Sequence, residues 1–312
     1  MIEVAIMLEG QNGLTWERFK NIAIATEELG FVGLYRSDHY TNANPPDKES
    51  LELWVSLAWL ATHTEILEFG PLVSPLSFRE PTMTARMARD VDDLSAGRLH
   101  LGLGAGWQER EHNNFGHVLL DIPNRFARFA EGLEVISQLL HSDEPVDFTG
   151  DYYQLADAVL LPRPHRVGGP PILIGGNGEM RTLPLVAKYA QEWNSIFLTP
   201  ERFREKNQQL DKLLITEGRQ ASEVRRSMML GLEYGRDDAE VRERVKTRTE
   251  GKLTPKDLTE RGLAVGTGDQ IVDHLGKLEE VGVQRVMLQW LDLDDMDRFE
   301  ALAKDVMPHV QA

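Results

Sequence analysis

The sequence contains no cysteine and has far fewer basic than acidic residues. With no cysteine among 312 residues, disulfide bonds, thiolate metal sites and cysteine nucleophiles are excluded. Asp and Glu number 50 against 34 Lys and Arg, and the net charge is -16. Nucleic acids and anionic membranes are bound through broad basic faces, so neither is expected as a partner. An anionic ligand must instead be held by local arginines and backbone N–H groups.

Long apolar runs are also missing. The amino terminus, MIEVAIMLEGQNG, has no basic region ahead of an apolar stretch, so no secretory signal is expected. The most apolar helical stretch, Leu51 to Ala61, is much shorter than the ~20 residues that cross a bilayer. We therefore expect a cytoplasmic protein. The helix that carries Trp54 and Trp59 is interpreted as core, with the interface of a homodimer as the alternative.

What is present is a series of strand-like runs at roughly thirty-residue spacing, the length of one strand plus one helix. Amphipathic helical segments separate these runs. Eight strands that alternate with helices predict a (β/α)8 TIM barrel of the α/β class, and we expect a single domain over residues 1–312. The predicted strands are Glu3–Leu8, Val32–Arg36, Ile66–Val73, Leu99–Gly104, Ile172–Gly175, Trp193–Phe197, Ser227–Glu233 and Gln284–Gln289.

Capping signals support the helices. Gly30 and Gly97 are expected just after helix ends, where a left-handed residue is favoured. Thr199 followed by Pro200 predicts a helix start, and Thr267 with Gln270 predicts a capping box.

Two of the intervals between predicted strands are longer than thirty residues, and they predict insertions after the fourth and seventh strands. The first contains Val146–Leu155, which we expect to form a β-hairpin around Gly150 and Asp151. The second, Asp237–Val265, is expected to hold a charged helix and then a second helix that begins near Thr254 and Pro255. The hairpin, the segment Glu250–Leu263 and Gln11 are expected to shape the substrate pocket.

In such a barrel, functional residues follow the last residue of each strand. Asp38 and His39 follow the second strand, where a carboxylate beside an imidazole can orient a ring nitrogen or help to move a proton near neutral pH. A hydrogen-bonded loop pair is the alternative. The third strand ends in GPLVSP at 70–75, where a bulge or strained peptide would bring backbone against a flat ligand. An ordinary strand-to-loop exit is the alternative, and Arg79 beyond it faces either an anion or solvent.

The fourth strand ends in Gly104, Ala105, Gly106 and Trp107. The glycines let a ligand approach the backbone, and Trp107 offers an apolar wall. A metal site is a weaker interpretation of the acids and histidine that follow, because they lack the two-histidine spacing of a zinc helix. These residues are Glu109, Glu111 and His112.

The fifth strand ends in Gly175, Gly176, Asn177 and Gly178, directly before a helix. A glycine-rich strand exit that opens a helix presents free N–H groups and the positive end of the helix dipole, which is a natural phosphate site. Arg181 would add a bidentate contact to such a phosphate. A tight turn that requires glycine is the alternative.

Taken together, these strand exits resemble the bacterial luciferase-like superfamily, and in particular its branch of oxidoreductases that depend on coenzyme F420, a deazaflavin. The resemblance runs in order from the first strand to the last, and the long stretches after the fourth and fifth strands are specific in combination. The matching stretches are SDHY at 37–40, GPLVSPLSFREP at 70–81, LSAGRLHLGLGAGWQEREHNNFG at 94–116, PPILIGGNGEMRTLPLVAKYAQEWN at 170–194 and VGTGDQIVDHLGKLEEVGVQRVMLQW at 265–290.

The resemblance implies a cofactor ring that lies across the strand ends, with a non-prolyl cis peptide behind it at Val73–Ser74. The phosphate would rest on Gly175 to Gly178 with Arg181 close by. Gly104, Gly106 and Trp107 would line the cofactor site. Asp38 and His39 match the family's pair beside the reactive ring, which makes His39 the first candidate for proton transfer.

One position departs from the pattern. Deazaflavin-dependent sugar-phosphate dehydrogenases carry a glutamate where this sequence has Trp107, which argues against sugar-phosphate oxidation. Glu109, two residues further on, is a second catalytic candidate.

The resemblance implies hydride transfer between coenzyme F420 and a small organic substrate. The first alternative is an FMN-dependent monooxygenase that uses dioxygen on the same barrel. Positive side chains at Arg79, Arg163 or Arg166 would favour the deazaflavin, whose tail is acidic. A metal-dependent hydrolase and a non-catalytic flavin-binding protein are further alternatives. The former would need a His-x-His at a strand end, which the sequence lacks.

Overall fold

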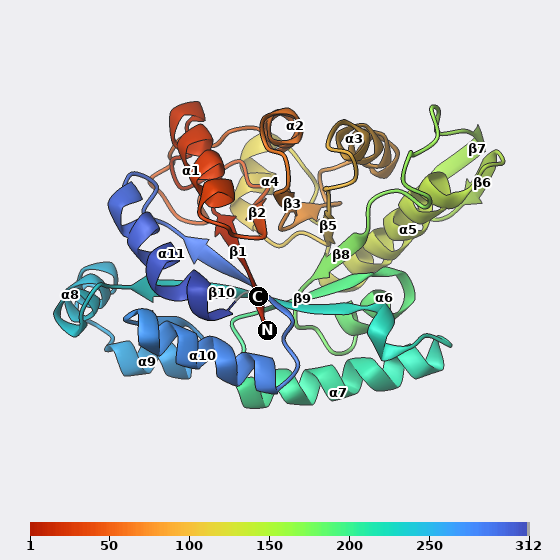
Figure 1. Cartoon of the computed structure of the whole chain (residues 1–312). Coiled ribbons are helices and arrows are strands. Elements are labelled where there is room, and N and C mark those ends of the chain that lie inside the picture. Colours follow the sequence, from red (N-terminus) through yellow and green to blue (C-terminus); the bar gives the residue numbers. More distant parts are fainter. Residues whose placement is uncertain (311–312) are drawn as a thin grey trace.

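The computed structural model describes residues 1–310 and contains a barrel of parallel strands surrounded by helices (Figure 1). The last two residues of the expected 1–312 domain lie outside the described part. Around the barrel the strands are β3 (Glu68–Pro71), β2 (Gly33–Arg36), β1 (Glu3–Leu8), β12 (Arg285–Trp290), β10 (Arg225–Tyr234), β9 (Glu192–Ile196), β8 (Ile172–Gly175), β5 (Leu101–Gly104) and β4 (Ser74–Pro75). An isolated bridge between Phe69 of β3 and Leu99, just before β5, joins the two sides of the gap in the ring of strands.

The barrel prediction is confirmed, and every predicted strand overlaps an observed one. The two-residue strand β4 was not predicted. It forms because the chain leaves β2 at the end of β3 and then pairs with β5, where Ser74 lies opposite Leu103.

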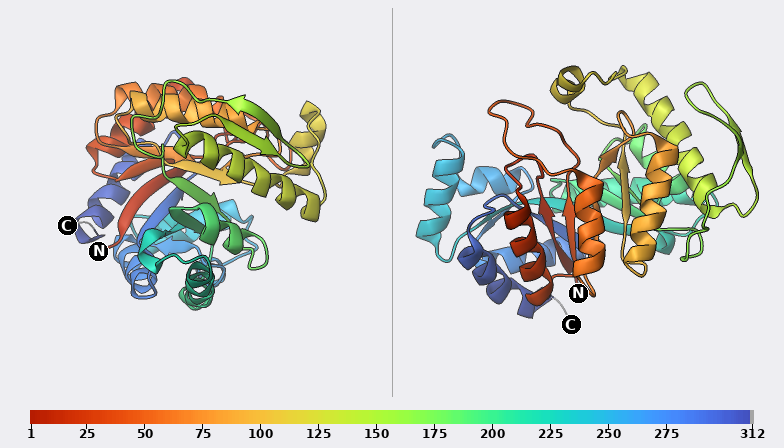
Figure 2. Two further views of the ribbon diagram at one scale, coloured as in Figure 1. Left: turned by 90° about the vertical axis from the view of Figure 1, so that its right-hand side faces the viewer. Right: turned by 90° about the horizontal axis from the view of Figure 1, so that it is seen from above.

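Helices follow the strands and form the outer ring (Figure 2). The expected caps are present: Gly30 and Gly97 have φ of 82° and 88°, Thr199 caps a helix that starts at Pro200, and Thr267 forms a capping box with Gln270. The ring helices are α1 (Trp16–Glu28), α2 (Leu53–His63), α3 (Pro81–Leu94), α5 (Ile122–His141), α6 (Thr182–Tyr189), α7 (Pro200–Thr216), α10 (Gly268–Glu280) and α11 (Met296–Val310). Within residues 1–310, none of the helices has the length and apolar character needed to cross a bilayer.

The first interruption of the strand–helix alternation is the insertion after the fourth predicted strand. It contains α4 (Glu109–Phe115) and an antiparallel hairpin of β6 (Val146–Thr149) and β7 (Gln154–Ala158), which lies outside α5 in Figure 1. The second holds α8 (Asp238–Arg248), α9 (Pro255–Glu260) and β11 (Ala264–Gly266). The hairpin and both helices were predicted. The strand β11 was missed, because three residues carry too little periodicity to detect.

The second interruption, which contains α8, α9 and β11, contacts the barrel through a strand pairing and through ion pairs. β11 pairs in parallel with the end of β10, where Leu232 lies opposite Ala264. An ionic cluster also joins Glu233 at the end of β10 to Arg248 of α8, and Asp292 beyond β12 to Arg244 at 2.6 Å.

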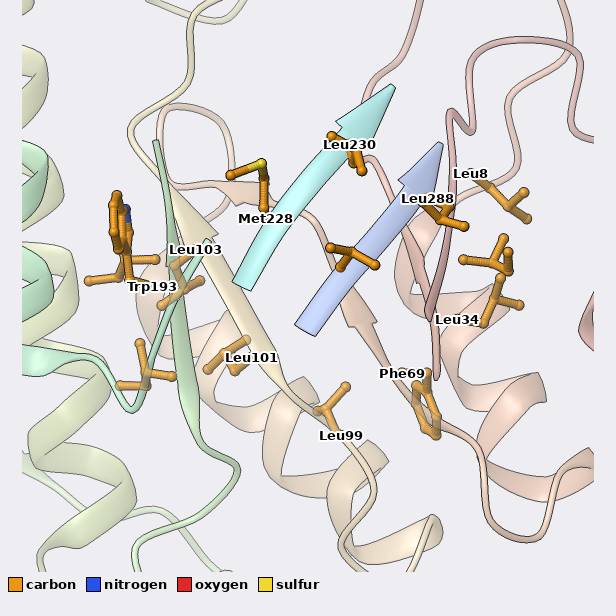
Figure 3. Packing of buried hydrophobic residues seen from close by; sticks show 14 of the residues in the cluster. Leu8, Leu34, Phe69, Leu99, Leu101, Leu103, Trp193, Met228, Leu230 and Leu288 are labelled. Atoms are coloured by element: carbon orange, nitrogen blue, oxygen red, sulfur yellow. The ribbon is translucent and has the colours of Figure 1, made fainter. Parts of the chain in front are cut away.

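The apolar core has two layers, because successive strand residues point to opposite faces. Outward side chains such as Leu8, Leu103 and Met228 pack between strands and helices (Figure 3). Trp54 is buried in this layer and Trp59 packs against it, so the core interpretation of their helix is confirmed. The barrel interior is filled by Ala5, Met7, Tyr35, Leu72, Leu173 and Met287.

The amino-terminal end of the barrel is closed by buried charges. Arg285 contacts Glu68 at 2.5 Å, and His100 lies between Glu68 at 3.1 Å and Glu192 at 3.3 Å. Burial acts to lower the pKa of His100, but the hydrogen bonds and charges of the two carboxylates outweigh it, and the pKa is raised. This end is plugged, so a ligand must enter at the opposite, carboxyl end of the strands.

Candidate active site

His39 lies just past the end of β2 and is held by a carboxylate from another strand exit. Its Nδ1 is 2.9 and 3.1 Å from the two carboxylate oxygens of Glu111 on α4, which is 1 % exposed. Glu111 also accepts the backbone N–H of Tyr40 at 3.0 Å. With Nδ1 as donor to Glu111, Nε2 is the nitrogen left to exchange a proton with a ligand.

The charge state of His39 depends on this contact. Burial acts to lower the pKa of His39, yet the hydrogen bond that His39 donates to Glu111 and the nearby carboxylates of Glu111, Glu9 and Asp38 outweigh burial, so the pKa is raised. The contact with Glu111 therefore lets the buried imidazole keep its ability to take up a proton, as a histidine that gives or takes protons requires.

Asp38 is occupied by neighbouring side chains. Its carboxylate accepts hydrogen bonds from Ser74 Oγ at 2.9 Å and from Arg79 Nε and Nη2 at 2.9 and 2.7 Å. Arg79 also contacts Glu52 at 2.7 Å. Asp38 therefore ties the β2 exit to the β4 exit and fixes the loop that carries His39.

The turn between β3 and β4 contains the expected non-prolyl cis peptide, but one residue earlier. The cis bond is Leu72–Val73, so the prediction of Val73–Ser74 was wrong. The reason is the change of partner strand: the Leu72 N–H still bonds to Arg36 O at 2.7 Å, whereas Ser74 already pairs with β5.

Val73 then covers the carboxyl end of the barrel interior. A Cβ added to Gly104 would come within 2.5 Å of Val73 Cγ2, and one added to Gly175 within 3.0 Å of Cγ1. The glycines of β5 and β8 are therefore needed to seat Val73. Its side chain forms an apolar floor between these two strand exits, on which a planar ring can lie.

The β5 exit continues from this floor. Gly106 has a φ of 81°, and a side chain there would collide with Ser77 Oγ. Trp107 is 63 % exposed, and its ring lies edge-on to the His39 ring with centroids 5.7 Å apart. The Trp107 ring therefore forms an apolar surface beside His39, the candidate for proton transfer.

Two of the residues after Trp107 that the weaker metal interpretation involved, Glu111 and His112, are engaged with other protein groups. Glu111 is engaged with His39, while His112 is buried and bonds to Ser77 Oγ at 2.8 Å and to Gln108 O at 2.7 Å. Glu109 is exposed at the first turn of α4. Over residues 1–310, no three His, Asp or Glu side chains converge as metal ligands.

The β8 exit presents a loop with unused backbone donors. The Asn177 side chain is engaged: it donates to Ile196 O at 2.7 Å and accepts the Ile196 N–H at 3.0 Å, which ties the loop to β9. Gly176 has a φ of 126°. Within residues 1–310, the N–H groups of Gly178 to Arg181 have no acceptor in the chain. The exposed Arg181 borders a hollow of about 400 Å³ that also adjoins Gly178.

The predicted residues surround one mouth. Asp38 contacts Ser74, which pairs with Leu103 on β5; Gly104 and Gly175 both abut Val73. His39, the Val73 floor and the β8 loop therefore belong to a single site, built by segments far apart in the sequence.

Comparison with known proteins identifies the family of the chain. A family model described as luciferase-like monooxygenase matches residues 2–285. The chain belongs to this family.

Its relatives within the luciferase-like family include enzymes named for two kinds of chemistry. An F420-dependent glucose-6-phosphate dehydrogenase of Amycolatopsis mediterranei (strain U-32) is 30% identical over 303 residues, which is 93% of this chain and 84% of the relative. A 4-hydroxyprotoasukamycin monooxygenase of Streptomyces nodosus subsp. asukaensis is 32% identical over 177 residues, which is 57% of this chain and 46% of the relative.

Solved structures confirm the luciferase-like barrel. An F420-dependent secondary alcohol dehydrogenase in complex with an F420-acetone adduct superposes with a TM-score of 0.87 at 17% identity, over 100% of this chain and 99% of that one. The monooxygenase RslO1 from Streptomyces bottropensis gives a TM-score of 0.83 at 19% identity, over 99% and 100%.

The arginines expected to serve an acidic cofactor tail are engaged elsewhere. Arg79 is paired with Asp38 and Glu52, and Arg163 donates to Leu139 O and to Asp143. Arg166 pairs with Asp92 and packs on Gly97, which precedes β5. That contact places Arg166 at the amino-terminal end of the barrel, so this part of the prediction was wrong.

Sequence reasoning also left two site residues without a role. Glu111 was considered only as a metal ligand, although its position one helical turn beyond Trp107 could have drawn attention to it. Glu9 follows β1, and its carboxylate accepts hydrogen bonds from Gln11 Nε2 at 2.8 Å and Gln289 Nε2 at 2.7 Å. Gln11 lies in this network, and its place in the substrate pocket stays a prediction.

Proposed function

We propose that the protein is a coenzyme F420-dependent oxidoreductase that transfers a hydride between the deazaflavin and a small organic substrate. The observation that carries the proposal is the meeting of a Glu111-oriented His39, an apolar floor and a loop of free N–H groups at one mouth. The relative that covers most of this chain at 30% identity is named as F420-dependent, which supports the choice of cofactor.

The residues present fit such a cofactor. Gly104 and Gly175 make room for Val73, whose side chain forms a floor that a flat ring can approach. The N–H groups of Gly178 to Arg181 and the Arg181 guanidinium are suited to a phosphate, because unpaired backbone donors before a helix favour anions. When bound, the deazaflavin accepts or supplies the hydride.

In this proposal His39 handles the proton. During substrate oxidation Nε2 accepts the hydroxyl proton as the hydride leaves the adjacent carbon, and during reduction it returns that proton. Glu111 fixes the ring and stabilises the imidazolium form. Val73 and Trp107 limit water around the reacting atoms.

Cofactor titration followed by turnover tests the proposal. Purified protein is titrated with F420 and, separately, with FMN, and ring fluorescence is recorded. We expect F420 to bind more tightly. His39→Ala is expected to keep the F420 Kd and to lose about 10²–10⁴-fold in kcat on a substrate of the wild type. A His39→Ala protein with full turnover would remove the proton-transfer role.

An FMN-dependent monooxygenase is the second candidate, and the 32% identity to the monooxygenase from Streptomyces nodosus favours it. Tight binding of FMN without binding of F420 would decide for this candidate. The same barrel mouth and the same His39 would then serve oxygen chemistry with reduced flavin supplied from outside.

A further inference from the structure

The inward-facing positions at the carboxyl ends of the strands carry no lysine or arginine. Strand residues alternate between inside and outside, so the interior residues Met7, Tyr35, Leu173 and Met287 define the inward set. Continued to the mouth, that set holds apolar and neutral polar residues, two acids and one histidine. It includes Glu9, Ser37, His39, Val73, Gly104, Gly175, Ile196, Met229, Gly231, Glu233 and Gln289.

Two arginines in the loops near His39 are neutralised by carboxylate partners. Arg79 is held by Asp38 and Glu52, and Arg110 is paired with Asp47 at 2.6 Å. On the opposite side of the mouth, Arg244, Arg248 and Arg298 are bound by carboxylates in the cluster around Glu233 and Asp292. Arg181 lies beside the free N–H groups and is assigned to the cofactor's phosphate.

Glu9, unlike these arginines, has no partner of opposite charge among the described residues. Its donors are the neutral amides of Gln11 and Gln289, and within residues 1–310 it forms no ion pair. Gln11 is in turn fixed by Ser37 Oγ at 2.7 Å, and Ser37 accepts the N–H of Gly10 at 2.8 Å. The network holds a negative carboxylate in place at the mouth, close enough to His39 to raise its pKa, and leaves its charge uncompensated.

We propose that the substrate is uncharged or cationic, and that Glu9 selects it by accepting a hydrogen bond from an O–H or N–H group. This inference rests on the proposed function. A phosphate or carboxylate on the substrate would lie near the carboxylates of Glu9, Asp38 and Glu111, and like charges repel strongly in a partly buried site. Within residues 1–310, Arg125 and Arg128 of α5 form no ion pair, but they donate to the carbonyl oxygens of Gly106 and Ser77. Lys48 is exposed and donates to Asn12 Oδ1 at 3.0 Å. Trp107 adds an apolar wall, so the preferred class is an alcohol or amino alcohol with a hydrocarbon body.

The reaction balances for such a substrate. The carbon that bears the hydroxyl group loses a hydride to the deazaflavin and becomes a carbonyl carbon. The hydroxyl proton passes to Nε2 of His39. A separate O–H or N–H group on the substrate remains bonded to Glu9 and is unchanged.

The first experiment measures the charge of the mouth and needs no turnover. Cofactor-loaded wild type, Glu9→Gln and Glu280→Gln are compared by quenching of deazaflavin fluorescence with iodide and with neutral acrylamide at low salt. Glu280 is the matched control, because it is exposed at the end of α10 on the opposite side of the barrel. We expect the iodide-to-acrylamide ratio to rise about two- to fivefold in Glu9→Gln only. An unchanged ratio in Glu9→Gln overturns the proposal.

The second experiment measures substrate choice on one carbon skeleton. The alcohols are trans-4-aminocyclohexanol, 1,4-cyclohexanediol and 4-hydroxycyclohexanecarboxylate, which are cationic, neutral and anionic. We expect kcat/KM for the first two to exceed that of the carboxylate at least tenfold, and Glu9→Gln to shrink the preference for the amine over the carboxylate at least fivefold. Glucose 6-phosphate should be a poor substrate beside glucose. Preference of the wild type for the carboxylate, or for the phosphorylated sugar, overturns the proposal.

Failure of the proposed function has a different signature. A wild-type protein that binds no F420 refutes the choice of cofactor before either experiment begins. The quenching comparison then proceeds with FMN, whose ring fluoresces as well, and still decides whether Glu9 makes the mouth repel anions.

Discussion

Replacing Glu111 by glutamine should expose how the protein sets the proton affinity of His39. The glutamine has nearly the same shape and still offers an oxygen to His39 Nδ1 and to the Tyr40 N–H, so the loop should stay in place. The change removes one buried negative charge. Burial of His39 then dominates, and the pKa of His39 should fall.

The size of the effect follows from the contact. The carboxylate lies 2.9 and 3.1 Å from Nδ1, and a hydrogen bond to a charged group contributes about 1.5–3 kcal/mol. Because each 1.36 kcal/mol changes a rate tenfold, kcat/KM should fall by about 10- to 150-fold.

The pH profile gives a second readout with a definite sign. In substrate oxidation, neutral His39 is the base, so activity rises as pH passes its pKa; in reduction, the imidazolium is the acid, so activity falls there. Glu111→Gln should move both transitions to lower pH. F420 binding, measured by fluorescence titration, should be nearly unchanged.

Glu109→Gln is the matched control, because Glu109 lies two residues earlier on α4 and is exposed. We expect it to keep the wild-type profile and rate within about twofold, as for a surface substitution. A profile that shifts in Glu109→Gln but not in Glu111→Gln would refute the assignment and restore Glu109 as the catalytic carboxylate.

Three further predictions concern the floor, the phosphate loop and the plugged end of the barrel. Gly104→Ala places a methyl group 2.5 Å from Val73 and should lower the free energy of unfolding in urea by about 1–3 kcal/mol. F420 binding should also weaken, because Val73 is displaced. Unchanged stability and binding would contradict the packing role. Arg181→Gln should weaken F420 binding about fivefold, and the loss should shrink at high salt, as expected for an exposed ion contact worth about 1 kcal/mol. For His100, whose folded pKa is raised, the free energy of unfolding should be at its full value below the ordinary histidine pKa and decline as pH rises through the raised value. His100→Gln should abolish that decline in urea melts at a series of pH values and cost about 2 kcal/mol at the acidic end.

The barrel was predictable from the sequence because its signals are local. Each strand is a short apolar run, and caps such as Thr267 with Gln270 lie within one helical turn, so a reader of the sequence sees them directly. The same holds for the glycine-rich exits at Gly104 and Gly175, whose position after a strand indicates the mouth.

The contacts that give the site its chemistry were not predictable, because they join distant segments. His39 and Glu111 are 72 positions apart, and nothing in either segment shows that α4 turns its third residue toward β2. The place of the cis peptide was missed by one residue, since it depends on which strand Ser74 pairs with. Arg163 and Arg166 were misplaced because their partners lie on α3 and α5, at the other end of the strands.

The way the second interruption is fastened has a consequence for how new specificities arise. Pairing of β11 with β10 and the ionic cluster at Glu233 hold both ends of the stretch between α8 and β11. Leu258 is buried and Gly262 and Leu263 pack against β9 and β10, whereas none of residues 250–257 is buried. Mutations in residues 250–257 can therefore accumulate, or be introduced by directed evolution, without loosening the proton-transfer machinery. Libraries confined to those residues offer a route to altered substrate range.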